Sequence, residues 1–131
     1  MERRPLALVT GASAGIGAAF ARELAGRGYD LVLTARRVER LQALAAELHE
    51  RHGAACTVLP ADLEEPDAPG LLAAELERRG LAVEMLVNNA GYGVPGYLLD
   101  PDWPTHARFL RIMVEAPVEL AWRLLPGMIE R

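Results

Sequence analysis

Short apolar runs of strand length alternate along the chain with longer amphipathic stretches of helix length. Such alternation is typical of βαβ units on a parallel sheet. We expect four units, with strands over residues 6–10, 30–35, 55–61 and 83–88 and helices ending near Gly28, covering 38–52 and covering 70–79. Right-handed crossovers then give the spatial strand order 3-2-1-4. The predicted fold class is α/β, a Rossmann-like doubly wound parallel sheet of about four strands.

The start of the third helix carries its own signals. Asp62 and Glu65 have the spacing of a capping box, with Asp in place of the usual Ser or Thr. Pro66 and Pro69 are tolerated only at a helix entrance, so the body of the helix is expected after them. Gly80 is expected to end it.

The last part of the chain predicts a long loop followed by a long helix. Residues 91–104 contain three glycines and three prolines, which makes them a candidate functional loop. The helix is expected to begin near Pro104 and to run to the C-terminus. Because Pro117 has no N–H to donate to the carbonyl of Met113, we expect a kink between these two residues and a free carbonyl at Met113.

The turn between the first strand and the first helix is rich in glycine, with the sequence TGASAGIG over residues 10–17. Glycine lets the backbone turn tightly and lets a pyrophosphate approach, while the free N–H groups at the helix N-terminus attract the anion. The pattern predicts a binding site for a dinucleotide cofactor. The residues assigned to it are Gly11, Ser13, Ala14, Gly15, Ile16 and Gly17.

The second strand is followed by Arg36 and Arg37, where a site that prefers NAD would carry an acidic residue for the adenosine ribose. Two guanidinium groups can instead hold a 2′-phosphate through charge-assisted hydrogen bonds. We therefore expect NADP (NADPH) as the cofactor and NAD to bind less well. A solvated basic helix start is the alternative interpretation, although the helix dipole disfavours it.

Two further segments end strands of the predicted sheet. Asp62 follows the third strand, where its carboxylate can cap a helix, accept a hydrogen bond from the adenine amino group, or do both. Residues 88–91, with the sequence NNAG, follow the fourth strand. A plain turn would explain them, but the end of that strand faces the predicted cofactor crevice.

Composition bounds the remaining possibilities. The 131 residues are 51% hydrophobic and 24% charged, with a net charge of -4, which is typical of one globular domain over 1–131 and argues against nucleic-acid binding. Cys56 is the single cysteine, and no apolar run approaches the roughly 20 residues of a membrane span. We expect a cytoplasmic protein without membrane contact. His49 and His52 share a helix face but lack a third ligand, so no metal site is predicted.

These segments, in this order and spacing, resemble the short-chain dehydrogenase/reductase family, specifically its classical members with the TGxxxGxG and NNAG signatures. The resemblance extends over essentially the whole chain and implies an oxidoreductase that transfers hydride between NADP(H) and a carbonyl or alcohol. It implies that the glycine turn binds the pyrophosphate, that Asp62 and Leu63 lie by the adenine, and that the NNAG segment steadies the sheet beside the cofactor. The NNAG residues assigned to the site are Asn89, Ala90 and Gly91.

The chain departs from the family pattern in its catalytic residues. The family uses a serine and a Tyr-x-x-x-Lys pair, in which the lysine lowers the tyrosine pKa. None of the fourteen basic residues here is a lysine, and Met113 aligns with the family's catalytic asparagine, where we interpret it as core packing. No catalytic residue is therefore assigned. The expectation is an N-terminal cofactor-binding portion that is inactive as this chain.

Two other interpretations stay open. The fourth strand lies at the edge of the predicted sheet although the sequence MLV over residues 85–87 is as apolar as a central strand. A noncatalytic nucleotide-binding or interaction module would pair this edge with a partner, and a homo-oligomer would use this edge or the final helix. A gene fragment that does not fold stably is the third interpretation.

Overall fold

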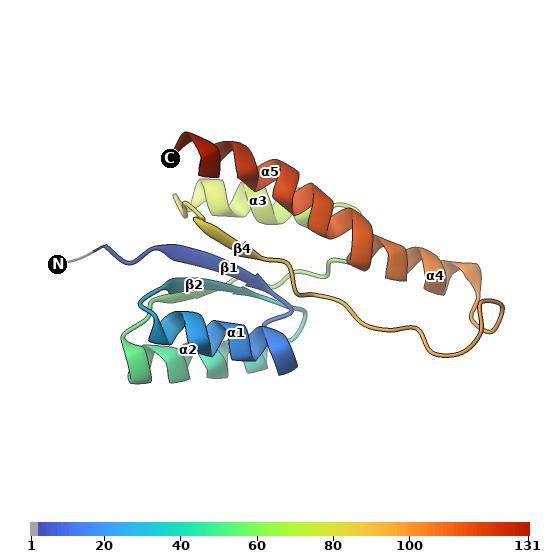
Figure 1. Ribbon diagram of the computed structural model, residues 1–131, viewed down its shortest axis with the longest axis horizontal. Coiled ribbons are helices and arrows are strands. Elements are labelled where there is room, and N and C mark those ends of the chain that lie inside the picture. The colour runs from blue at the N-terminus through green and yellow to red at the C-terminus, as the bar shows by residue number, and fades with distance from the viewer. Residues whose placement is uncertain (1–2) are drawn as a thin grey trace.

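The computed structural model describes residues 3–131 and has one four-stranded parallel sheet in the order β3-β2-β1-β4, as the sequence predicted (Figure 1). Its strands are β1 (Leu6–Thr10), β2 (Asp30–Thr34), β3 (Cys56–Val58) and β4 (Met85–Val87). Its α-helices are α1 (Gly15–Gly26), α2 (Val38–His52), α3 (Ala68–Arg78), α4 (Trp103–Leu110) and α5 (Ala116–Glu130). No helix within the described residues is long and apolar enough to span a membrane.

Helices cover both faces of the sheet, with α1 and α2 on one face and α3 and α5 on the other (Figure 1). Successive residues of a strand point to opposite faces, so Val9 of β1 packs with α1 and α2 while Leu8 packs with α3 and α5. Both side chains are fully buried. Because all four strands run parallel, their carboxyl ends, and the loops that follow them, lie at one edge of the sheet.

Both outer strands are shorter than the sequence predicted. The expected strand over 55–61 is reduced to Cys56–Val58, although the N–H groups of Leu59 and Ala61 still donate to β2 and the segment after it. Pro60 between them has no N–H to donate. The expected strand over 83–88 is reduced to Met85–Val87, whose residues are half-buried because only β1 pairs with it.

The capping box predicted at Asp62 is wrong. The Asp62 carboxylate accepts the N–H of Glu64 at 3.0 Å and closes a turn, while α3 begins later, at Ala68. Asp67 precedes the helix without a side-chain capping bond. Pro66 lies between Asp62 and Asp67. Because it has no N–H to donate, a helix that begins at Asp62 cannot continue regularly through it. The predicted end at Gly80 is confirmed, with a φ of 66°.

The predicted interruption of the last helix takes the form of a π-helical segment over Arg111–Glu115 between α4 and α5. The N–H of Ala116 donates to the carbonyl of Arg111, five residues earlier, rather than four. Pro117 follows at once and cannot donate to Met113, so the regular α-helical bonding cannot pass through this point. The break therefore begins slightly earlier than the kink expected between Met113 and Pro117. It is a shift of the backbone hydrogen bonds from a spacing of four residues to a spacing of five.

Candidate functional site

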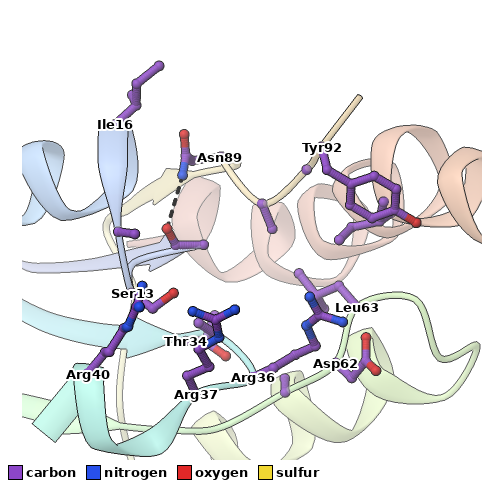
Figure 2. Close-up of a pocket in the computed structure, with 17 residues that line it drawn as sticks. Ser13, Ile16, Thr34, Arg36, Arg37, Arg40, Asp62, Leu63, Asn89 and Tyr92 are labelled. Carbon is purple, nitrogen blue, oxygen red and sulfur yellow. Dashed lines mark hydrogen bonds between the residues drawn. The ribbon is translucent and has the colours of Figure 1, made fainter. Parts of the chain in front are cut away.

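A cavity of about 500 Å³ opens at the carboxyl ends of β1, β2 and β4 (Figure 2). In the order β3-β2-β1-β4 the chain builds the sheet on one side of β1 and then crosses to the other side to form β4. In open α/β sheets, ligands bind at the carboxyl ends of the strands next to such a change of direction. Most of the sequence-predicted residues line it, namely Gly11, Ser13, Ala14, Ile16, Arg36, Arg37, Asp62, Leu63, Asn89, Ala90 and Gly91. The sequence did not single out five further residues that line it, namely Thr34, Ala35, Arg40, Ala61 and Ile112, whereas Tyr92 belongs to the candidate functional loop over 91–104.

The glycine turn has the geometry of an anion cradle. Gly11 and Gly15 have φ values of 63° and 57°, which residues with a side chain rarely adopt. Gly17 does not line the cavity but makes the turn possible, because a Cβ there would lie 2.1 Å from the Gly11 carbonyl oxygen. Ala14 precedes α1 with no side-chain cap, so the first N–H groups of the helix are left for a ligand. A phosphate group fits this turn.

Asn89 fastens the glycine turn to the end of β4. Its side-chain amide donates to the carbonyls of Thr10 and Gly11, each at 3.2 Å. In return, the buried Thr10 hydroxyl accepts the backbone N–H groups of Asn89 and Ala90, each at 2.9 Å. Two segments far apart in sequence are thus held as one wall of the cavity. The position of Asn89 within the NNAG sequence was the signal that identified it.

Three arginines line the side of the cavity that follows β2. Arg36 and Arg37 were expected, whereas Arg40, on the first turn of α2, was missed. Asp62 is the single carboxylate among the residues that line the cavity. This side of the cavity is therefore strongly cationic. The signal that could have found Arg40 is its place in the first turn of the helix expected over 38–52, shortly after Arg36 and Arg37.

Two other parts of the cavity lining are formed by Leu63 and by Tyr92. Leu63 is buried, 6% exposed, and packs into the core, so it presents an apolar surface next to the Asp62 carboxylate. Tyr92 in the loop after β4 packs against Phe109 of α4, with ring centroids 5.9 Å apart. Partial burial and the nearby Glu64 carboxylate raise the pKa of the Tyr92 hydroxyl. A tyrosine that exchanges protons at neutral pH requires the opposite shift.

Met113 was expected in the core, and that interpretation is wrong. Its side chain is 43% exposed, because no element covers this part of the π-helical segment within the described residues. Its sulfur lies so close to Gly91 that a Cβ on that glycine would be 2.5 Å away. The contact explains why a residue without a side chain ends the NNAG segment.

Comparison with known proteins agrees with this geometry. The family model for the short chain dehydrogenase matches residues 5–131. The very-long-chain 3-oxoacyl-CoA reductase of Anas platyrhynchos is 40% identical over 130 residues, which cover 95% of this chain and 41% of that protein. Nodulation protein G of Rhizobium sp. (strain N33) is 39% identical, over 95% of this chain and 49% of that protein.

Solved structures match equally well. A short-chain dehydrogenase from Sphingobium yanoikuyae in complex with NADPH superposes with a TM-score of 0.89 at 37% identity, over 96% of this chain and 49% of that one. L-sorbose reductase from Gluconobacter frateurii, complexed with NADPH and L-sorbose, superposes with a TM-score of 0.92 at 32% identity, over 98% and 49%. The chain spans about half the length of these relatives. It belongs to the short-chain dehydrogenase family.

Proposed function

We propose that this chain binds NADP(H) as the cofactor-binding portion of a short-chain oxidoreductase. The observation that carries the proposal is the cationic side of the cavity, where Arg36 and Arg37 follow β2 in place of an acidic residue. A carboxylate there would accept hydrogen bonds from an unmodified ribose, whereas guanidinium groups bind a phosphate on it. The relatives solved with NADPH support the same choice of cofactor.

Each wall of the cavity has a part in holding the dinucleotide. The free N–H groups at the start of α1, with Ser13, Ala14 and Ile16, bind the pyrophosphate. Asp62 and Leu63 receive the adenine, one by hydrogen bonding and the other by apolar contact. The segment from Asn89 to Gly91 forms the wall beside the remaining half of the cofactor. When bound, the cofactor supplies a hydride for transfer to a carbonyl, or accepts one from an alcohol.

The 131 residues by themselves are expected to bind the cofactor without turnover. None of the tyrosines is followed four residues later by a lysine, since the chain has no lysine. Tyr92, which lines the cavity, has a pKa shifted upward, away from the value a proton donor at neutral pH needs. The hydride transfer is therefore proposed for the whole enzyme. The cytoplasmic location expected from the single cysteine remains a prediction.

The test is a fluorescence titration of the purified chain with NADPH and with NADH. We expect saturable NADPH binding at least about tenfold tighter than NADH binding, because one charge-assisted hydrogen bond is worth about 1.5 kcal/mol or more. Parallel assays with a panel of ketones and aldehydes should show no consumption of NADPH. Equal affinity for both cofactors would refute the NADP preference, and robust carbonyl reduction would refute the lack of turnover.

A second candidate function, a noncatalytic module that pairs with a second copy, is favoured by one surface. Apolar side chains on α5 are exposed, namely Val118 at 65%, Trp122 at 70% and Ile129 at 74%, and β4 lies at the edge of the sheet. Exposed apolar surface of this kind favours association. Sedimentation of the wild-type chain and of Trp122→Gln tests it. A dimer that dissociates on this substitution and still binds NADPH would favour pairing, whereas a wild-type monomer would exclude it.

A further inference from the structure

Met113 differs from the other sulfur-containing residues within the described range 3–131 in its exposure. It is 43% exposed, whereas Met85, Met128 and Cys56 are half-buried. Burial also raises the pKa of the Cys56 thiol to about 11, so at neutral pH this residue lacks the thiolate that reacts with oxidants. A thioether needs no deprotonation before it is oxidised. An oxidant in solution therefore reaches a reactive sulfur most readily at Met113.

The π-helical segment between α4 and α5 places this sulfur against a wall of the cavity. The N–H of Ala116 bonds back over five residues, which widens the helix at this point, and such wide turns are frequent at functional sites. Within the turn Ile112 lines the cavity, and the next residue, Met113, contacts Gly91. A Cβ on Gly91 would lie 2.5 Å from the Met113 sulfur and 3.5 Å from its terminal methyl carbon. Chemistry at the sulfur thus acts directly on this contact.

The contact supports the end of a segment that is otherwise held by hydrogen bonds. The backbone N–H groups of Asn89 and Ala90 donate to the Thr10 hydroxyl, each at 2.9 Å. Gly91, the next residue, lines the cavity and packs against the Met113 sulfur. An oxygen atom on this sulfur adds volume and polarity, so the side chain would have to move off the glycine toward water. The wall would then lose the packing that supports it.

We propose that Met113 is an oxidative modification site, at which a peroxide converts the thioether to a sulfoxide and thereby weakens cofactor binding. Hydrogen peroxide transfers one oxygen atom to the sulfur, its O–O bond breaks, and the second oxygen leaves as water with both hydrogens. The sulfur loses two electrons and the peroxide gains them. Methionine sulfoxide reductases reverse this step. The inference rests on the proposed function and adds regulation to the same site.

The test treats the 131-residue chain with limiting hydrogen peroxide, locates the added oxygen by peptide mass spectrometry, and measures NADPH and NADH affinity before and after. Met113 should be oxidised before Met85 and Met128. Both affinities should fall about fivefold or more, because Gly91 lies on a wall that does not distinguish the two cofactors. Incubation with methionine sulfoxide reductase and dithiothreitol should restore them. Thermal melts verify that the oxidised chain remains folded.

Three variants assign the effect to one sulfur. Met113→Leu, which keeps an apolar side chain of similar volume without sulfur, should have the same affinities before and after peroxide. Met113→Gln, which places a polar group where the sulfoxide would be, should bind NADPH more weakly than wild type without any peroxide. Met128→Leu is the matched control, since Met128 is half-buried on α5, and it should stay as sensitive as wild type.

The outcomes separate this inference from the function on which it rests. If the untreated wild-type chain binds neither cofactor, the proposed function fails and the inference fails with it. If the wild type binds NADPH but Met113 is not the first methionine oxidised, or its sulfoxide leaves the affinity unchanged, the inference alone is wrong. Loss of affinity in peroxide-treated Met113→Leu would also overturn it, because oxidation elsewhere would then be the cause.

Discussion

The side-chain amide of Asn89 lies 3.2 Å from the carbonyl oxygen of Gly11, a residue 78 positions earlier in the chain. The bond joins the loop after β4 to the glycine turn after β1. Because both segments line the cavity, its shape depends on this contact.

Asn89→Ala should therefore weaken both the fold and the site. The substitution removes the bonds to Thr10 and Gly11, and each hydrogen bond contributes about 0.5 to 1.5 kcal/mol. We expect the free energy of unfolding in urea to fall by about 1 to 3 kcal/mol. Asn88→Ala is the control, since the exposed Asn88 amide makes one bond, to the Pro117 carbonyl. Equal losses in the two variants would contradict the assigned role of Asn89.

Gly17→Ala should be among the most damaging single-methyl additions. Its Cβ would lie 2.1 Å from the Gly11 carbonyl oxygen and 2.5 Å from the Asn89 amide nitrogen. Overpacking typically costs about 1 to 3 kcal/mol, and here it also displaces the cradle, so NADPH binding should be lost. Gly93→Ala adds the same methyl group where no atom lies within 4 Å. Calorimetry and NADPH titration of the pair should separate them, and equal behaviour would refute the packing argument.

The affinity for NADPH should depend on salt more strongly than the affinity for NADH. Arg36, Arg37 and Arg40 are exposed, so salt screens their attraction for a phosphate. Raising NaCl from about 50 to about 500 mM shortens the Debye length several-fold and should weaken NADPH binding more than NADH binding. Titrations at both salt concentrations measure the difference. Parallel curves would mean that the cations do not contact the phosphate that distinguishes the cofactors.

Cys56 should make stability depend on pH in the alkaline range. Burial raises the pKa of its thiol from the ordinary 9.0 to about 11, so between these values the folded chain keeps a proton that the unfolded chain has lost. The contribution is complete below pH 9 and is lost as the pH rises through 11. Melting temperatures across this range should fall more steeply for the wild type than for Cys56→Ala. Parallel curves for the two proteins would exclude a titrating buried thiol.

Much of the fold was predictable because its signals are local. Strand β1, helix α2 and the helix ends marked by Gly28 and Gly80 follow from apolar spacing and from glycines, which the structure places at positive φ. Most of the candidate site was predictable for a related reason. In a parallel sheet the carboxyl ends of the strands meet at one edge, so the motifs that follow them lie together.

The remaining features were not predicted correctly, each for its own reason. The capping box predicted at Asp62 has the right spacing but does not form, because Pro66 has no N–H to continue a helix and α3 begins only at Ala68. Met113 was misplaced because exposure depends on which elements cover a helix face, and no local pattern records that. Arg40 was missed because a charge at a helix start has an ordinary solvated interpretation until its partners are known.

The amino-acid sequence by itself determined the order of the elements, the strand order and the glycine turn, since these follow from local backbone preferences and the handedness of crossovers. Only the tertiary structure decided which polar groups are paired. It placed the Asn89 amide on the Gly11 carbonyl and, within residues 3–131, left the Thr34 hydroxyl and the guanidinium groups of Arg36, Arg37 and Arg40 without partners at one cavity. Pairing depends on distances between residues far apart in sequence, and these exist only once the chain is folded.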